Sequence, residues 1–201
     1  TRPPGRSRSL LIDAGVRYRG YCSDITRTTA GPGEGRFAAL IHGLEQLQQR
    51  LCALVAPGVS YVEIHRKAHL GIAALLSASG LVRGLSEEDQ VATGVTRAFF
   101  PHGIGHFLGI QVHDVAGRPV PPPADAPFLR LTRTLEPGMV VTIEPGLYFI
   151  PSLLQPLLDG PQGRHLDQTL LAELMGCGGI RIEDNVAVLA SGAQNLTRGG
   201  L

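Results

Sequence analysis

Four acidic residues of this chain lie inside short segments that are otherwise typical of buried β-strands. They are Asp13 in SLLIDAG, Asp24 in YCSDITRTT, Glu144 in MVVTIEPGLYFI and Glu183 in GIRIEDNVAVLA. Side chains of a strand alternate between two faces, so any one of these acids could simply face solvent. Four such segments together favour a sheet that gathers several carboxylates on one face. This requirement constrains the fold more than any other feature of the sequence.

The composition indicates one globular domain. The chain has 201 residues, of which 43% are hydrophobic and 17% charged, so it can bury a core of ordinary size. No apolar run approaches the ~20 residues that a membrane-spanning helix needs. The net charge of +1 lacks the basic footprint typical of proteins that bind nucleic acid or anionic membranes. We therefore expect a single domain over residues 1–201, without nucleic-acid or membrane partners.

The cysteines and the N-terminal segment favour a cytoplasmic location. Cys22, Cys52 and Cys177 are widely spaced and form no CxxC pair, which fits neither a disulfide framework nor a zinc finger. Residues 1–9 are basic, but the short apolar stretch that follows is broken by Asp13, unlike a signal peptide.

Hydrophobic periodicity predicts an α+β protein. The first two acidic segments read as a hairpin, and a capping box of Ser60 and Glu63 precedes the second of two long helices. Strands and helices are mixed without a βαβ rhythm. The predicted helices cover residues 34–56, 62–79, a short stretch after Ser86, and 167–175; the later strands cover 139–150 and 179–190.

The predicted hairpin places two carboxylates close together. With the turn centred between Tyr18 and Arg19, Asp13 lies directly opposite Asp24 on the same face. Cross-strand Cβ atoms are ~4.5–5.5 Å apart, and two ionised carboxylates at that distance repel unless positive charge lies between them. A divalent cation would satisfy both, although one of the acids could instead cap a turn or face solvent.

Further ligands support the cation hypothesis. His106, in PHGIGHFLG, offers an imidazole among glycines that allow close backbone approach, although a lone histidine there is also typical of a hydrogen-bonded core residue. Together with Asp13, Asp24, Glu144 and Glu183 it makes a set of four carboxylates and one imidazole. Neutralising four negative charges away from water requires about two divalent cations. Such a set suits Mn²⁺, and Co²⁺ or Zn²⁺ could bind the same groups.

Five motifs carry a resemblance to a known family. IDAG, SDITRT, PHGIGHFLGIQVHDVAG, TIEPGLYF and GGIRIEDNV, in that order, resemble the pita-bread metallopeptidases, and in particular their Xaa-Pro dipeptidase (prolidase) branch. The likeness covers the chain from Leu10 onward. It implies a pita-bread fold, a mainly antiparallel, curved, mixed sheet covered by helices. Members of this branch have an N-terminal domain and an earlier part of the catalytic domain, including a histidine near the substrate, so we expect a C-terminal catalytic fragment.

The resemblance also implies a role for each site residue. The five metal ligands fall on Asp13, Asp24, His106, Glu144 and Glu183. Asp24 and Glu183 would bridge two metals, Asp13 would chelate one, and His106 and Glu144 would complete the other. Glu144 would also shuttle a proton, while His102 and His113 would bind substrate and stabilise the oxyanion. Two such metals can hold a bridging hydroxide that attacks the scissile carbonyl.

Three of these side chains keep alternative interpretations. His102 and His113 could be loop histidines that donate to backbone carbonyls. Arg181 lies two residues before Glu183 and so points to the same face of its strand. Its guanidinium could bind a dipeptide carboxylate, hold a metal-ligating carboxylate, or form a structural ion pair.

The expected function is metal-dependent hydrolysis of dipeptides with proline in the second position, by an enzyme that is a homodimer at full length. Aminopeptidase P, which accepts longer peptides, is the nearest alternative, and methionine aminopeptidase fits IRIEDN and His102 less well. The same centre could attack phosphotriesters as a side activity. The alternative to an enzyme is a pita-bread module that binds a partner without catalysis.

Overall fold

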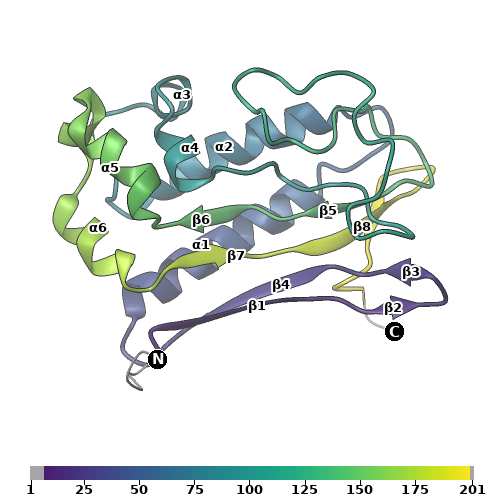
Figure 1. The fold of residues 1–201 in the computed structure, drawn as a ribbon, viewed down its shortest axis with the longest axis horizontal. Helices are drawn as coiled ribbons and strands as arrows, with labels where there is room; N and C mark the ends of the chain where they lie inside the picture. Colours follow the sequence, from purple (N-terminus) through teal and green to yellow (C-terminus); the bar gives the residue numbers. More distant parts are fainter. Residues whose placement is uncertain (1–6, 200–201) are drawn as a thin grey trace.

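The computed structural model describes residues 7–199 as one layer of strands backed by helices (Figure 1). Most of the basic leader, residues 1–6, lies outside the described residues, so the prediction about a signal peptide is not tested there. The mixture of helices and antiparallel strands confirms the α+β class. In the described part of the chain, no helix combines the length and apolar character needed to cross a membrane.

The described strands form five short antiparallel ladders. β1 pairs with β4, β2 with β3, β5 with β8 and β8 with β9, and β6 with β7. Figure 1 shows these ladders side by side, with β5 and β6 in one line, β7 and β8 in the next, then β4 and β1. The strands are β1 (Ser9–Ala14), β2 (Arg17–Tyr18), β3 (Tyr21–Cys22), β4 (Ile25–Ala30), β5 (Val140–Ile143), β6 (Gly146–Tyr148), β7 (Gly179–Arg181), β8 (Asp184–Val188) and β9 (Ala193–Asn195).

The two long helices lie behind this layer, and shorter helices lie at one end (Figure 1). The helices are α1 (Gly35–Cys52), α2 (Tyr61–Ala78), α3 (Glu87–Ala92), α4 (Val95–Phe99), α5 (Pro151–Asp159) and α6 (Gln168–Met175), with a 3₁₀ helix at Pro161–His165. The predictions for α1, α2, α3 and α6 are confirmed to within a few residues. α4 and α5 were not predicted, since α4 follows Gly94 and α5 begins at Pro151, and both residues also read as loop signals.

The predicted capping box at α2 is wrong in its bonding. Ser60 is the N-cap residue, but its side chain makes no cap hydrogen bond. The Ser60 backbone instead bridges to Thr134, which fixes the entry of the helix by strand-like pairing. Glu63 forms an ion pair with Arg66 on the same helix.

The predicted hairpin register is also wrong, by one residue at the turn. Asp13 lies opposite Thr26, not Asp24. The turn centres on Arg19 and Gly20, with φ of 51° and 93°, and two positive φ angles define the tight turn that matches the twist of the strands. Asp24 therefore lies in the gap between β3 and β4, two residues from Thr26 and on the same face. Both carboxylates still face one side of the sheet.

Two predicted strands are each interrupted at an acidic residue. The segment 139–150 divides into β5 and β6 at Glu144–Pro145, and the segment 179–190 divides into β7 and β8 at Ile182–Glu183. A break in a ladder bends a strand and re-aims its side chains. The interruptions therefore direct these glutamates out of the regular pleat.

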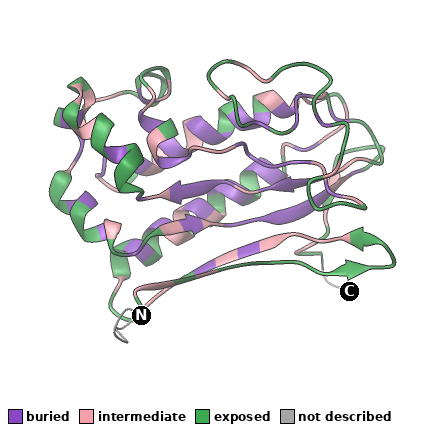
Figure 2. Cartoon of the chain, viewed as in Figure 1, coloured by how far each residue is buried: buried purple, intermediate pink, exposed green. Residues whose placement is uncertain are grey.

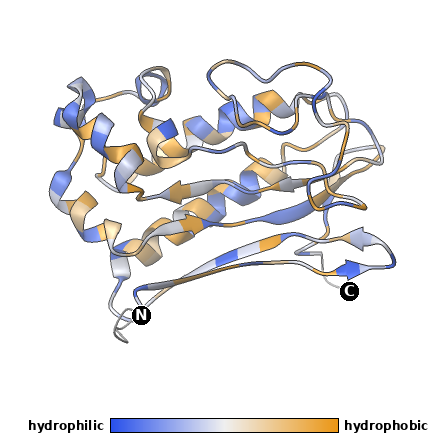
Figure 3. Cartoon of the chain, in the orientation of Figure 1, coloured by the Kyte–Doolittle hydropathy of each residue, from blue (hydrophilic) through white to orange (hydrophobic). Residues whose placement is uncertain are grey.

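Apolar side chains of α1 and α2 fill the space between helices and sheet. Leu44, Ile72 and Val141 are fully buried in this core. Figure 2 shows β5, β6 and β8 as buried, whereas β1 and the β2–β3 hairpin are largely exposed. The start of β8 is buried in Figure 2 yet hydrophilic in Figure 3, so a charged segment lies inside the fold. Leu10 and Ile12 leave more than half of their surfaces exposed on β1.

A matched pair of leucine substitutions tests this core. Leu44 is 0% exposed and Leu10 is 57% exposed. We expect Leu44→Ala to lower the free energy of unfolding by ~2–5 kcal/mol, because it removes packed methyl groups and leaves a cavity. Leu10→Ala should change it by no more than ~0.5 kcal/mol. Chemical denaturation of both variants measures the difference, and equal losses would contradict the burial described for β1.

Candidate metal centre

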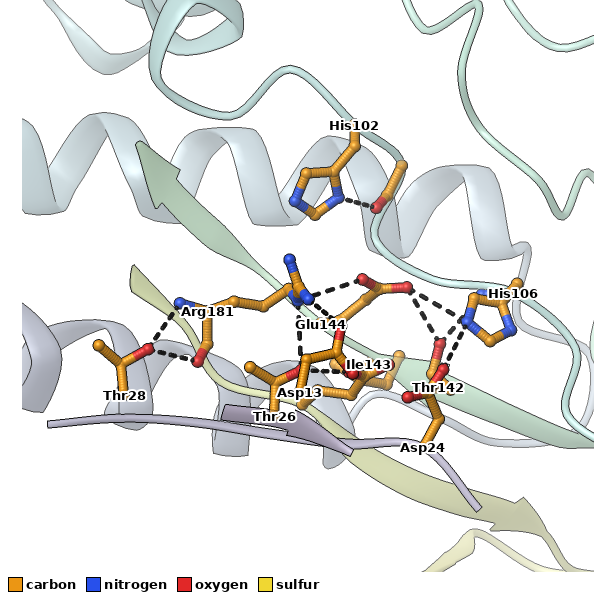
Figure 4. A network of polar contacts seen from close by, with 12 residues as sticks. Asp13, Asp24, Thr26, Thr28, His102, His106, Thr142, Ile143, Glu144 and Arg181 are labelled. Carbon is orange, nitrogen blue, oxygen red and sulfur yellow. Dashed lines mark hydrogen bonds and ion pairs between the residues drawn. The ribbon is translucent and has the colours of Figure 1, made fainter. Parts of the chain in front are cut away.

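Five side chains from distant parts of the sequence converge on one face of the strand layer. Figure 4 shows Asp13, Asp24, His106 and Glu144 of this set. Asp13 comes from β1, Asp24 follows β3, Glu144 follows β5, and Glu183 lies between β7 and β8. His106 lies in an extended segment bridged to β5 through Phe107 and Val141. The structure thus brings together all five residues that the sequence predicted as ligands.

Their ligand atoms form three overlapping groups. Asp13, Asp24 and Glu183 make one group, and His106, Glu144 and Glu183 make the second. Asp24, His106 and His113 make the third, and within each group the donor atoms lie within 4.8 Å of one another. Glu183, Asp24 and His106 each belong to two of the groups, so neighbouring groups share donors. Oxygen-rich groups with one or two imidazoles suit Mn²⁺, Co²⁺ or Zn²⁺.

The pKa values of the two glutamates show how strongly this site disfavours their negative charge. Burial raises the pKa of Glu183 to about 8, and the nearby charge of Glu144 adds to the shift. Burial likewise raises the pKa of Glu144 to about 7, against the opposing effect of His106 and Arg181. One oxygen of Glu183, Oε1, is buried without a hydrogen-bond partner. A cation is the partner that this oxygen and these charges fit.

His106 is oriented for ligation. Its Nδ1 donates to the backbone carbonyl of Phe107 at 2.8 Å, which leaves Nε2 facing the carboxylates. Nε2 lies 3.5 Å from both Asp24 Oδ2 and Glu144 Oε1. Burial lowers the pKa of His106, but the hydrogen bonds to Asp24 and Phe107 and the charges of Glu144 and Glu183 together outweigh it, so the pKa lies above its ordinary value. A backbone partner of this kind is typical of metal-binding histidines.

His102 lies at the wall of the same cavity. Its Nδ1 donates to the Gly103 carbonyl at 2.8 Å, and its Nε2 lies 2.9 Å from the Tyr148 hydroxyl. Burial lowers the pKa of His102 to about 4, so the ring is neutral at physiological pH. The alternative interpretation, in which the ring donates to a backbone carbonyl, is therefore correct for Nδ1. Nε2 of the neutral ring accepts a hydrogen bond from the Tyr148 hydroxyl.

His113 stands edge-on to His106, with ring centroids 4.3 Å apart. Burial and the neighbouring His106 lower its pKa. The adjacent Asp114 shapes the loop, since its carboxylate accepts from the backbone N–H groups of Ile110 and Val115. His113 is therefore a neutral imidazole that a folded loop holds at the cavity.

Arg181 reaches the centre of the carboxylate cluster (Figure 4). Its guanidinium pairs with Asp13, donates to the Tyr148 hydroxyl at 3.1 Å, and lies 3.9 Å from Glu144. The prediction that it shares the site face of Glu183 is confirmed. Because Asp13 occupies part of the guanidinium, this geometry favours the interpretation in which Arg181 holds a ligating carboxylate.

Two threonines that sequence reasoning missed orient the glutamates. The Thr26 hydroxyl donates to Glu183 Oε2 at 2.6 Å and accepts from Arg181. The Thr142 hydroxyl accepts from the His106 backbone N–H at 3.1 Å and contacts Glu144 Oε1 at 3.4 Å. Thr26 lies opposite Asp13 on the neighbouring strand, and Thr142 lies two residues before Glu144. These relations indicate a role in the site only once the register of the strands is known.

The cluster lines a cavity of about 460 Å³. Three further residues of its wall were not predicted: Arg118, Phe128 and Arg130. They come from the loop between α4 and β5, whose proline-rich sequence carries no periodicity that would indicate which side chains face the site. Phe128 leaves 68% of its surface exposed. The cavity thus combines a carboxylate floor with a wall of two guanidinium groups and one aromatic ring.

The fold and this cluster define a protein with a carboxylate-rich centre that suits divalent cations. A model of metallopeptidase family M24 matches residues 3–190, and the chain belongs to that family. This membership, together with the structural likenesses below, confirms the expected pita-bread fold.

Individual relatives refine the comparison. The chain is 77% identical to an Xaa-Pro dipeptidase of Marinobacter nauticus over 197 residues, covering 98% of this chain and 46% of that protein. An Xaa-Pro dipeptidase of Edwardsiella ictaluri is 47% identical over 204 residues, with the same coverage of 98% and 46%. The chain therefore spans about half the length of the curated relatives it matches.

Solved structures give the same picture. A variant of Escherichia coli aminopeptidase P superposes with a TM-score of 0.71 at 30% identity, covering 96% of this chain and 38% of that one. Proline aminopeptidase P II from Yersinia pestis superposes with a TM-score of 0.68 at 33% identity, covering 98% and 40%.

The raised pKa values predict how the stability of the metal-free chain depends on pH. A carboxyl group whose pKa is higher in the folded state stabilises that state below its unfolded pKa, and this contribution is lost as pH rises through the folded value. For Glu144 and Glu183 the window runs from their ordinary value of 4.5 to about 7 and about 8. We therefore expect the melting temperature of chelator-treated chain to fall between pH 5 and pH 8.

Glu183→Gln provides the control, because the amide cannot ionise and should flatten this dependence. Differential scanning calorimetry measures both proteins. A wild-type melting temperature that rises across this range would contradict the assigned protonation.

Proposed function

We propose that this chain carries the active centre of a two-metal peptidase that cleaves Xaa-Pro dipeptides. The observation that carries the proposal is the convergence of two donor groups that share Glu183 at the floor of an open cavity. The five residues Asp13, Asp24, His106, Glu144 and Glu183 would hold two divalent cations, with Mn²⁺ favoured and Co²⁺ or Zn²⁺ also suited. When bound, such a pair supplies Lewis acidity and lowers the pKa of water.

Glu144 would move the proton. Its pKa of about 7 places it where a carboxyl group can both accept and donate at neutral pH. Thr142 and Arg181 lie beside its two oxygens and keep the carboxylate in one orientation. Glu144 would take a proton from the attacking water and return it to the leaving nitrogen.

The histidines would act on the substrate. His113 is neutral, partly exposed and beside the ligand His106, so it can donate a hydrogen bond to an oxygen on which negative charge develops. His102, which also lines the cavity, is fixed through Gly103 and Tyr148 and would orient the substrate.

Arg118 and Arg130 would recognise the free carboxylate of a dipeptide. Arg118 is oriented by its bond from Nε to the Leu129 carbonyl at 2.9 Å. Arg130 forms no ion pair with any residue in the range 7–199, so its charge is available to a ligand. The imide nitrogen before proline has no hydrogen to donate, so recognition must use the ring and the termini. Phe128, at the cavity wall, offers an apolar surface for that ring.

The relatives favour the dipeptidase over aminopeptidase P. The curated relatives named above are Xaa-Pro dipeptidases at up to 77% identity, whereas the aminopeptidase P structures share about a third of their residues with this chain. The retained ligand set supports catalysis over a module that only binds. We further propose a cytoplasmic enzyme, supported by three unpaired cysteines, and a homodimer, supported by the apolar surface of β1 and the β2–β3 hairpin.

Glu144→Gln tests the chemistry. We expect it to lower the rate of Xaa-Pro dipeptide hydrolysis in Mn²⁺ by ~10²–10⁴-fold, because the amide cannot transfer the proton. Glu88→Gln, at an exposed position on α3, is the matched control and should retain the wild-type rate. Equal rates for Glu144→Gln and wild type would remove the assigned chemistry.

Arg130→Gln tests the recognition of the substrate carboxylate. Loss of one charge-assisted hydrogen bond should raise KM for the dipeptide by roughly 10- to 100-fold and leave the amidated dipeptide unaffected. Arg133→Gln is the control, since Arg133 pairs with Glu136 and does not line the cavity. Turnover of a tripeptide without turnover of the dipeptide would favour aminopeptidase P instead.

A further inference from the structure

Asp24 differs from the other carboxylates in how its backbone is held. β3 ends at Cys22 and β4 begins at Ile25, so Asp24 lies in a gap of its own hairpin. Gly15 lies across the hairpin from it, between the pair Ala14–Ile25 and the bond from Ser23 N–H to the Val16 carbonyl. A Cβ on Gly15 would stand 1.9 Å from the Ser23 carbonyl oxygen, so the strands approach closely here. The backbone N–H and C=O of Asp24 instead form their hydrogen bonds toward β8, with the side chain of Asn185.

Three positions connect β4 to the line formed by β7 and β8. At the middle position the backbones bond directly, from Glu183 N–H to the Thr26 carbonyl at 3.1 Å. Two residues further along, the Thr28 hydroxyl replaces the direct bond, accepting from Arg181 N–H at 3.1 Å and donating to the Arg181 carbonyl at 3.0 Å. The pairs step by two residues in opposite directions along the strands, as in an antiparallel ladder. Side chains thus continue the ladder where the strands diverge.

Asn185 continues the same ladder at its other end. Its Oδ1 accepts from the Asp24 backbone N–H at 3.1 Å, and its Nδ2 donates to the Asp24 carbonyl. A side-chain amide carries one carbonyl and one N–H₂ group, so it can satisfy both backbone groups of a residue as a strand would. Asp24 is therefore the one ligand among the five whose two backbone groups are both held by a side chain.

Asn185 is itself fixed. It is 4% exposed, its backbone N–H donates to the Thr197 hydroxyl at 2.9 Å, and its carbonyl accepts from Leu196 N–H at 2.8 Å. Across the β5–β8 ladder it lies opposite Thr142, which contacts Glu144 and His106. The backbone of Asn185 is therefore fixed, and its side-chain amide bonds to Asp24 from this fixed position.

We propose that Asn185 is a positioning residue for Asp24, acting as a substitute strand that holds this carboxylate where two cations can share it. The inference rests on the proposed function, since it assigns Asn185 a role toward the metal pair. Asp24 belongs to two of the three donor groups, so a displacement of its backbone would disturb both ions. A carboxylate at position 185 would retain an acceptor for the Asp24 N–H but lose the donor to its carbonyl.

Two substitutions test this role. We expect Asn185→Ala to weaken the binding of the more loosely held Mn²⁺ by roughly 10- to 100-fold, the effect typical of losing a residue that orients a ligand. The electron paramagnetic resonance signal of a spin-coupled Mn²⁺ pair should disappear. Asn185→Asp, of nearly the same volume, should show the same losses. Calorimetric titration of the full chain gives the affinity of each ion.

Gln90→Ala is the matched control for stability. Gln90 is a fully buried amide that donates to the Ser77 hydroxyl and the Leu85 carbonyl, away from the cavity. It should lower the melting temperature of the metal-free chain at least as much as Asn185→Ala while keeping both ions and the coupled signal.

The outcomes separate the two proposals. A wild-type chain that binds a coupled pair, with Asn185→Ala and Asn185→Asp binding it equally well, overturns the role of Asn185 alone. Failure of both variants to fold also overturns it, because Asn185 would then serve the fold and not the site. A wild-type chain that takes up no pair of ions removes the proposed function, and this inference with it.

Discussion

Repulsion among buried carboxylates is the constraint on which the rest of the structure depends. Asp13, Asp24, Glu144 and Glu183 have donor oxygens only a few ångströms apart, an arrangement that ionised groups cannot sustain without positive charge. In the metal-free chain, the pKa values of Glu144 and Glu183 are raised, and the guanidinium of Arg181 pairs with Asp13. The fold therefore has to hold these groups together against their own repulsion. It does so with backbone that is fixed from behind by α1 and α2, and with threonine hydroxyls that determine which oxygen of each glutamate faces the cavity.

The sequence alone predicts those parts of the structure that depend on residues close together in the chain. The helices α1, α2 and α6 and the acidic strand segments could all be predicted, because each depends on neighbours in the chain. The five predicted ligands converge, although their roles stay predictions. The register of the hairpin was wrong because one residue at the turn decides it, and a turn with positive φ at Arg19, a residue that rarely adopts it, gives no clear signal. Arg118, Arg130 and Asn185 could not be found, since a non-periodic loop and a contact between remote strands leave no pattern in the sequence.

The interruptions of the sheet coincide with the site. A continuous strand would alternate its side chains strictly between the two faces of the sheet. This regular alternation limits how closely carboxylates from neighbouring strands can approach one another. Here the strands break at Glu144, at Glu183 and at Asp24, and each break frees a carboxylate from the regular alternation. The lost backbone bonds must be recovered, because buried N–H and C=O groups without partners cost free energy. Side chains recover them, and this explains why Thr28 and Asn185, which are hydrophilic, are buried along this part of the fold.

The same line of contacts determines the spacing of the ligands. Thr28 fixes the backbone of Arg181, Thr26 pairs with Glu183, and Asn185 holds Asp24, so the register of β4 against β7 and β8 fixes three members of the site together. A shift of this register by one residue would turn every one of these side chains to the opposite face. Arg27 opposes such a shift, since its guanidinium bonds to the carbonyls of Thr26 and Glu183 and pairs with the fully buried Asp184. Burial alone would raise the pKa of Asp184, but hydrogen bonds from Asn195, Arg198 and Arg27 hold it below its usual range, so this carboxylate stays charged. The chain thus places a buried carboxylate, paired with Arg27 and Arg198, behind the sheet to keep four carboxylates aligned in front of it.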